Sequence, residues 1–301
     1  MKILIIDIDS KITNIALKKI EMFHELQGDE IFYNLPMMKG LCDKTYVSCV
    51  FDFNKHLCSE WEGIAEIGGS GYDLKKELPP EIDCMKPKTN IGFTTRGCIR
   101  ACEFCIVPKK EGKIHIVGDI FDFWDGISKN ITILDNNILA EPNHFKFICK
   151  QIRDNNLTVD FNQGLDCRLF TEDMAAELKT ISREDIRFAF DHISVYKNVV
   201  ETCRIIEKFK LPHPRWYVYA NEDFESALER LLILKRLGQR TYVMRDRRIT
   251  HLPKYIALAH WGCVPQLFDK VDFYDYLVNY GTGIKSKVKE LESVGLFSGL
   301  E

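Results

Sequence analysis

Several features that would place a protein in a particular class are missing from this sequence. No apolar run approaches the about 20 residues that cross a bilayer; the longest are short runs such as 3–6 and 231–234. The N-terminal apolar run contains Asp7 and Asp9 and lacks a small-residue cleavage site, so we expect no signal peptide. We therefore expect a cytoplasmic protein without membrane contact.

A strong excess of charge of one sign is also missing. The formal net charge of −3 argues against an electrostatic clamp for nucleic acid that involves the whole protein, and leaves a local basic patch as the alternative. Cysteine, by contrast, is abundant, with eleven residues in 301. Because disulfide frameworks belong to short secreted chains, metal ligation or buried thiols are the better interpretation of these cysteines.

Residues 1–86 have the pattern of a small flavodoxin- or Rossmann-like α/β domain. Apolar residues at helical spacing predict one helix over 12–26. Apolar, β-branched and aromatic runs predict strands at 2–9, 30–35, 44–51 and 64–69. The polar, proline-bearing stretch 75–89 reads as a linker to the next domain.

From residue 87 the sequence alternates between strand and helix patterns. Strands are predicted at 90–97, 131–137, 158–164, 186–191, 214–220 and 240–245. Helices are predicted at 117–129, 142–156, 171–181, 194–210, 223–238 and 251–262. Six such units are too few for an eight-fold barrel, so we predict a partial (β/α)6 barrel over 87–265. Its chemistry should lie at the C-terminal strand ends, and 266–301 should form a helical extension.

Three cysteines follow the first strand of this series, in TTRGCIRACEFC. Cys98, Cys102 and Cys105 have the spacing C-x3-C-x2-C. Three thiolates on one short loop can hold one face of a cubane iron–sulfur cluster and leave the fourth iron without a protein ligand. An open coordination position is what a catalytic metal site needs, and the neighbouring arginines favour thiolates.

Three other interpretations of the cysteine loop are weighed beside a cluster. Zinc would need a fourth ligand, for which His115 is the nearest candidate. A thiol–disulfide site could use Cys102 and Cys105, but it leaves Cys98 unexplained. Three buried thiols would suit an apolar segment better than this charged one. We favour the cluster.

The loop resembles the cluster motif of the radical S-adenosylmethionine (SAM) superfamily, in which an aromatic residue precedes the third cysteine, here Phe104. It is most similar to the version found in methylthiotransferases and in enzymes with an N-terminal cobalamin-type domain. The resemblance covers roughly residues 88–265. It implies a [4Fe-4S] cluster whose fourth iron binds SAM, reduction by an external donor of the flavodoxin or ferredoxin type, and a 5′-deoxyadenosyl radical that abstracts a hydrogen atom.

The resemblance also assigns cofactor contacts to polar residues at the strand ends. The triplet Asp135, Asn136 and Asn137 lies where the superfamily often has a Gly-Gly-Glu turn for the SAM amino group, although the glycines are absent. Asp191 lies at the ribose position and Asn221 near the adenine position. The motif NQGLDCR brings three further candidates, for the SAM carboxylate or the substrate: Gln163, Arg168 and Cys167.

Residues 1–86 resemble a shortened cobalamin-binding domain. That family carries D-x-H-x-x-G, then S-x-L, then G-G; the corresponding stretches here are 9–14, 48–50 and 68–69. Lys11 takes the place of the histidine that ligates cobalt, and Asn14 that of the glycine. Because a protonated lysine has no lone pair for a metal, we predict that the fold is kept and that cobalamin is unlikely to bind.

Three cysteines in the same domain raise the question of a second cluster, since methylthiotransferases carry three N-terminal cysteines. The spacing of Cys42, Cys49 and Cys58 is loose, and Cys49 falls within a predicted strand. Buried thiols are the simpler interpretation, with an auxiliary cluster as the alternative.

The substrate is the least determined part of the prediction. Arg245, Arg247 and Arg248 follow the sixth strand and could bind an anionic substrate such as a nucleoside, a nucleic acid or a carboxylate; solvated surface arginines are the equal alternative. The tail has a helical pattern, unlike the small β-barrel that methylthiotransferases use on RNA. The functions left open are a radical SAM enzyme, a methylthiotransferase-like enzyme modifying tRNA or protein, and a cluster- and SAM-binding sensor without turnover.

Overall fold

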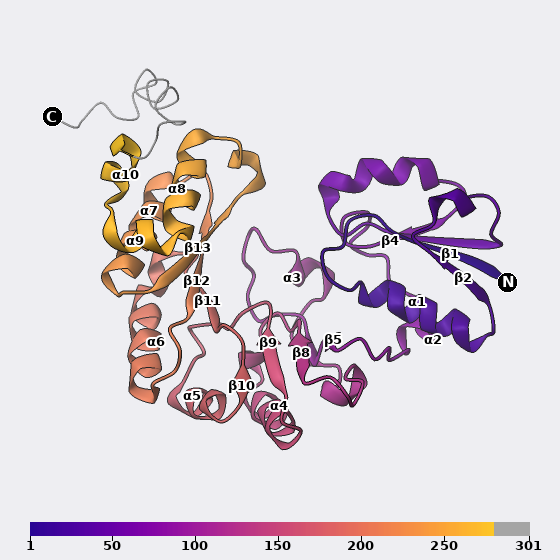
Figure 1. Ribbon diagram of the computed structural model, residues 1–301, viewed down its shortest axis with the longest axis horizontal. Helices are drawn as coiled ribbons and strands as arrows, with labels where there is room; N and C mark the ends of the chain where they lie inside the picture. The colour runs from indigo at the N-terminus through magenta and orange to yellow at the C-terminus, as the bar shows by residue number, and fades with distance from the viewer. Residues whose placement is uncertain (280–301) are drawn as a thin grey trace. The chain divides into compact units, whose positions relative to one another are not determined.

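The structure, a computed structural model, describes residues 1–279 (Figure 1). The chain divides into two compact units, Met1–Asn162 and Gln163–Glu301, and each is described by itself. The domain boundary predicted near residue 86 lies inside the first unit and stays a prediction. Among the described residues, no helix is long and apolar enough to cross a membrane.

The first unit begins with a four-stranded parallel sheet in the order β2-β1-β3-β4. This is the strand order of the flavodoxin-like doubly wound folds as far as it goes. Its elements agree with the predicted pattern: β1 Lys2–Asp7, α1 Ile15–Leu26, β2 Glu30–Tyr33, β3 Lys44–Ser48 and β4 Glu66–Gly68. Shorter elements are η1 Pro36–Met38, η2 Asp52–Trp61 and α2 Pro80–Asp83.

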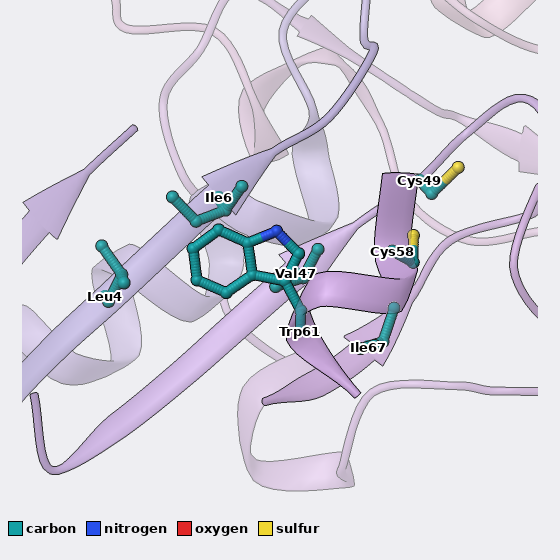
Figure 2. Packing of buried hydrophobic residues seen from close by; sticks show 7 residues of the cluster. All are labelled: Leu4, Ile6, Val47, Cys49, Cys58, Trp61 and Ile67. Atoms are coloured by element: carbon teal, nitrogen blue, oxygen red, sulfur yellow. The ribbon is translucent and has the colours of Figure 1, made fainter. Parts of the chain in front are cut away.

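Alternation along β1 gives this sheet two separate cores. Ile3 and Ile5 pack in one cluster with Leu17 and Ile20 of α1. Successive side chains of a strand point to opposite faces, so Leu4 and Ile6 join a second cluster of buried residues, shown in Figure 2: Val47, Cys49, Cys58, Trp61 and Ile67. Cys58 and Trp61 of this cluster come from the segment η2, so η2 covers this face of the sheet, with the indole of Trp61 as the largest buried side chain.

The rest of the first unit contains the start of the predicted barrel. The parallel strands β5 Ile91–Gly92, β8 Asn130–Ile133 and β9 Thr158–Phe161 lie side by side in that order. A small antiparallel pair, β6 Thr95–Arg96 and β7 His115–Ile116, precedes and follows helix α3 Val107–Lys110. The remaining elements are η3 Ile120–Asp122, η4 Ile138–Ala140 and α4 Pro142–Asp154.

The helix predicted over 117–129 is wrong, since only the single turn η3 forms there. Gly126 has φ +79°, a left-handed conformation that stops a helix. The Asp125 carboxylate accepts hydrogen bonds from the N–H groups of Ile127 and Ser128, both at 2.8 Å, which favours a turn. Ile120 is nevertheless buried, so the apolar pattern marked burial and not helix.

The second unit has a parallel sheet in the order β11-β12-β13 covered by helices. Trp216, Val218 and Val243 point to the buried face, whereas Tyr242 and Met244 on the other face are 46% and 44% exposed. The strands are β10 Ser182–Arg183, β11 Arg187–Ala189, β12 Arg215–Ala220 and β13 Arg240–Arg245. The helices are α5 Glu172–Lys179, η5 Ile193–Val195, α6 Tyr196–Phe209, α7 Phe224–Arg236, η6 Arg247–Ile249, α8 Pro253–Cys263, α9 Pro265–Lys270 and α10 Phe273–Asn279.

Local sequence explains where several of these helices begin. Pro142 is the first residue of α4, and the Thr171 hydroxyl caps α5 by accepting from the Met174 N–H. The helical extension predicted for 266–301 includes α9 and α10, and residues 280–301 lie outside the described residues.

A pair of glycine substitutions tests the packing of Gly69, which follows β4, against the backbone of Cys49, which follows β3. Gly69 has φ +95°, and an added Cβ would lie 2.3 Å from the Cys49 carbonyl oxygen; Gly63 has φ +78° with open space around it. Gly63→Ala should cost about 1–2 kcal/mol for the left-handed backbone alone. Gly69→Ala should cost about 3 kcal/mol or more, because overpacking is added. Urea unfolding followed by circular dichroism measures both, and equal midpoints would contradict the packing argument.

Candidate functional site

The cysteine loop leaves strand β6 through a position that only glycine can occupy. Gly97 has φ +79°, and a Cβ there would lie 2.3 Å from the Lys113 carbonyl oxygen. Cys98, Cys102 and Cys105 follow on irregular backbone before α3, and each is half-buried. None of the eleven cysteines, which all lie within residues 1–279, forms a disulfide.

Nitrogen donors surround the first cysteine of the loop. The Arg100 backbone N–H donates to Cys98 Sγ at 3.3 Å, and the Asn137 side-chain amide donates to the same sulfur at 3.7 Å. Hydrogen bonds of this kind stabilise a thiolate over a thiol. Asn137, predicted to contact SAM, thus lies beside Cys98, and its contact with SAM stays a prediction.

Asp135 anchors the segment that leads into the loop. Its carboxylate is 3% exposed and accepts four hydrogen bonds, from the N–H and hydroxyl groups of Thr94 (2.6 and 2.6 Å) and Thr95 (2.9 and 2.9 Å). Burial raises the pKa of Asp135, and these four donors act in the opposite direction. The structure therefore gives Asp135 a positioning role, while its predicted contact with SAM stays a prediction.

Glu111 organises the other side of the loop and was missed by the sequence analysis. Its Oε2 accepts from the Gly97 N–H at 2.9 Å and from the Asn136 amide at 2.7 Å, and its Oε1 pairs with Arg96 Nη2 at 2.8 Å. The positive charge of Arg96, expected to favour the thiolates, is thus largely offset. In the sequence Glu111 appears only as one acidic residue after two lysines, in KKEG. That pattern is too common to single out a functional residue.

The structure bears on the other interpretations of the cysteine loop. The three thiols are not buried, which contradicts the interpretation as core thiols. His115 is exposed, and its Nδ1 lies 3.0 Å from the Lys113 carbonyl oxygen. Among the described residues, no three Cys, His, Asp or Glu side chains are gathered so as to hold one metal ion. In a cubane each thiolate binds a different iron, so the absence of one converging point does not count against a [4Fe-4S] cluster, and the three cysteines stay the predicted ligands.

In the second unit the predicted residues Asp191, Cys167 and Arg168 interact. Asp191 follows β11 and accepts from the Tyr219 N–H at 3.0 Å. Burial raises the pKa of Asp191, and that hydrogen bond, Arg230 and Arg168 oppose the increase. Burial, together with the charge of Asp166, raises the pKa of the Cys167 thiol to about 12, so this thiol stays protonated near neutral pH.

The arginines predicted to bind substrate have partners within their own loop. Arg248 donates from Nε and Nη2 to the Asp246 carboxylate, both at 3.0 Å, and the Tyr219 hydroxyl donates to the same carboxylate. Arg245 donates to the Thr250 carbonyl at 2.8 Å, and Arg247 is exposed. Arg248 and Arg245 therefore have partners that a bound anion would have to replace.

The remaining candidates lie on surface loops of the second unit. Gln163 is exposed. Asn221 is also exposed, and its side-chain oxygen accepts from the Asp223 N–H at 3.2 Å, which shapes the turn before α7. Arg168 forms a two-point pair with Asp166, with Nε–Oδ1 and Nη2–Oδ2 distances of 2.7 and 3.1 Å.

The three stretches aligned with the cobalamin pattern do meet, at the edge of the first sheet formed by the C-terminal ends of its strands. Asp9 accepts from the N–H groups of Val50 at 2.7 Å and Phe51 at 3.0 Å. The Asn14 amide donates to the Ser48 hydroxyl at 2.9 Å. Gly69 packs against the backbone that follows β3. Lys11 is exposed at this edge, so the loops are assembled without a histidine at the ligand position.

An auxiliary cluster in this domain finds no support in the thiol environments. Cys49 and Cys58 are fully buried in the core of Figure 2. Burial, and then the charge of Asp9, raise the pKa of Cys49 to about 12, and burial raises that of Cys58. Cys42 packs against the same core. Protonated core thiols are poor cluster ligands, because the thiolate is the ligand.

No protein-family model matches the sequence. No curated protein matches it either. Among solved structures, the chain is similar to the radical SAM methyltransferase TsrM from Kitasatospora setae, solved with cobalamin and a [4Fe-4S] cluster bound. The TM-score is 0.63 at 10% identity, over 81% of this chain and 74% of that one. The likeness shows that this chain has the α/β, partial-barrel fold of a radical SAM enzyme, as predicted. It gives no support to the expectation that cobalamin is lost.

A carboxylate substitution tests how the loop is anchored. Asp135→Ala leaves four buried donors without an acceptor and should destabilise the protein by about 3–5 kcal/mol; iron bound after anaerobic reconstitution should fall with it. Asp125 accepts three comparable hydrogen bonds in an exposed loop, where water replaces them. Asp125→Ala should therefore retain the wild-type iron content. Urea unfolding and iron analysis measure the two effects, and equal losses in both variants would refute the anchoring role.

Proposed function

We propose that this chain, which has the fold of a radical SAM enzyme, binds a [4Fe-4S] cluster through Cys98, Cys102 and Cys105 and cleaves SAM reductively. Held by these thiolates and reduced by a flavodoxin- or ferredoxin-type donor, the cluster would supply the one electron needed to cleave SAM into methionine and a 5′-deoxyadenosyl group, which would end as 5′-deoxyadenosine after taking a hydrogen atom from the substrate. The observation that carries the proposal is the loop of three accessible thiols held between β6 and α3 of this fold.

The chain's own residues have separate tasks in this proposal. Asp135 holds the start of the loop at Thr94 and Thr95, and Glu111, which follows the loop, accepts from the Gly97 N–H, so the two ends of the loop are held together. The Arg100 N–H and the Asn137 amide stabilise the charge of Cys98. Asp191, by the superfamily resemblance, accepts hydrogen bonds from the ribose hydroxyls of SAM. Phe104, 47% exposed on the loop, offers an apolar surface beside the cluster.

We propose that the substrate is anionic, but we no longer assign its binding to Arg245 and Arg248, which already have hydrogen-bond partners. The face of the β11-β12-β13 sheet opposite to the buried one carries Tyr217 and Tyr242. Their rings pack edge to face, with 5.3 Å between the ring centroids. Arg215 and Arg240 lie on the same face and share the Asp185 carboxylate, at 2.8 and 3.5 Å. The aromatic rings of this face suit a ligand that contains a flat ring. Arg215 and Arg240 are the first residues of β12 and β13, at the end of the strands opposite to the expected site, and they already share a carboxylate, so we assign them no contact with the substrate.

A second candidate function is methyl transfer that depends on cobalamin. It is favoured by the assembled edge around Asp9, Ser48 and Gly69 and by the TsrM likeness. The residues present supply a surface but no imidazole for cobalt, so the fit to the usual ligand pattern is incomplete and we derive no step through cobalt. A methylthiotransferase-like activity is less favoured, because the thiols that a second cluster would need are buried.

Cysteine substitutions test the cluster assignment and separate an enzyme from a sensor. Cys102→Ala should lose most of the bound iron and all SAM cleavage, because two thiolates do not retain the cubane. Cys84→Ala, which removes an exposed thiol elsewhere, should behave like the wild type. Reconstituted protein is incubated with dithionite and SAM, and iron and 5′-deoxyadenosine are measured. A reducible cluster that never yields 5′-deoxyadenosine would indicate a sensor.

Titration with hydroxocobalamin tests the second candidate. That candidate expects a stoichiometric complex that survives gel filtration and whose spectrum lacks imidazole ligation, because Lys11 stands at the ligand position. Lys11→His should then introduce imidazole ligation. Lys2→His, at the opposite end of β1, should leave the spectrum unchanged. Failure of all three proteins to retain cobalamin would rule the candidate out.

A further inference from the structure

Helix α7 buries an arginine that the sequence analysis did not single out. The Arg230 residue is 2% exposed, and burial lowers the pKa of its guanidinium. Arginine is almost never fully buried unless its charge and its donors are satisfied. The groups that satisfy Arg230 therefore indicate what it does.

The donors of Arg230 are directed at backbone carbonyl groups. Nε donates to Ser226, one turn earlier in α7, at 3.0 Å; Nη1 donates to Phe190 at 2.7 Å; and Nη2 donates to Tyr219 at 3.0 Å. Phe190 directly follows β11, and Tyr219 lies at the end of β12. The rigid planar guanidinium thus ties together the C-terminal ends of two neighbouring strands.

The same two residues hold Asp191. Phe190 precedes Asp191 in the chain, and the Tyr219 N–H donates to Asp191 Oδ1 at 3.0 Å. Three titratable side chains lie close enough to Asp191 to interact with its charge. Arg230 belongs to α7, and Arg168 and Cys167 belong to the segment after β9. Burial raises the pKa of Asp191, and Arg230 and Arg168 oppose that increase. Arg168 is itself paired with Asp166, so Arg230 is the better placed of the two to balance the charge of the half-buried Asp191.

We propose that Arg230 is a positioning residue for SAM binding, which holds the strand ends that orient the half-buried Asp191 carboxylate and supplies positive charge near it. This inference rests on the proposed function, in which Asp191 accepts from the ribose hydroxyls. An ionised carboxylate can accept from both hydroxyls, whereas a protonated one has lost part of that capacity. Burial favours the protonated form of Asp191, and the positive charge of Arg230 favours the ionised form. Without the guanidinium, the pKa of Asp191 should therefore rise, and the carboxylate should take up its proton at higher pH.

The experiment uses the full chain with its cluster reconstituted anaerobically, and SAM as the probe. SAM affinity is measured between pH 5 and 8, roughly the range over which a buried carboxyl can titrate, by equilibrium dialysis for wild type, Arg230→Gln, Arg230→Lys and the control Arg236→Gln. Arg236 is an exposed guanidinium on the same helix. Selective ¹³C labelling of aspartate follows the Asp191 carboxyl directly, with Asp191→Asn to assign its signal.

Arg230→Gln should bind SAM about tenfold more weakly near pH 7, the effect of losing one hydrogen bond to a charged group. The pH below which binding fails should rise together with the Asp191 pKa. Arg230→Lys keeps the charge and should keep the wild-type pH profile, yet lose affinity because an ammonium cannot reach all three carbonyls. Arg236→Gln should match the wild type. A purely structural role would lower stability without moving the pH profile.

An unchanged Asp191 pKa and pH profile in folded Arg230→Gln would overturn the inference. Should Arg230→Gln fail to fold, Arg230→Lys decides: a folded lysine variant with wild-type SAM affinity overturns it, and a weakened one supports it. Absence of SAM binding by the wild type at every pH would instead count against the proposed function. The carboxyl signal of Asp191 would still report whether Arg230 controls its charge.

Discussion

The buried carboxylate of Asp135 is the constraint on which the arrangement of the cysteine loop depends. It follows β8, and it accepts every donor that Thr94 and Thr95 present as the chain passes from β5 into β6. A loop of half-buried thiols has little apolar contact of its own to keep it in one place. The four hydrogen bonds fix where the loop starts, and Glu111 fixes the backbone of Gly97 from the other side. Polar groups position this loop because its half-buried side chains cannot hold it by burial alone.

Carboxylates held by backbone N–H groups follow parallel strands in both units. Asp135 in the first unit is buried and accepts from the Thr94 and Thr95 N–H groups, whereas Asp191 in the second is half-buried and accepts from the Tyr219 N–H. They differ in compensation: Asp135 relies on neutral donors, whereas Asp191 also has the guanidinium of Arg230 nearby. A carboxylate held by neutral donors suits a fixed anchor. One balanced by a cation remains open to exchange a hydrogen bond with a ligand, which is the role proposed for Asp191.

The sequence predicted the strands well and the contacts of the polar residues poorly. Side chains alternate between buried and half-buried along β12 and between buried and exposed along most of β13, and the sequence predicts such alternation because it is local. Over 117–129 the same reasoning failed, since Asp125 and Gly126 favoured a turn over the helix that the apolar residues suggested. Arg245 and Arg248 were expected to face a substrate, yet nearby acceptors in their own loop occupy them. Such pairing depends on distances that spacing along the chain does not encode.

The sequence by itself determined the type of fold and offered a set of thiol donors, because both are local patterns: repeated strand and helix segments and three cysteines at C-x3-C-x2-C. Only the tertiary structure decided which cysteines are accessible, since Cys49 and Cys98 differ in burial and not in residue type. It also assembled the edge around Asp9, Ser48 and Gly69 and revealed Glu111 and Arg230, whose partners are far away in sequence. Burial and long-range hydrogen bonds arise when distant segments pack together, and they decide which of the available groups can act.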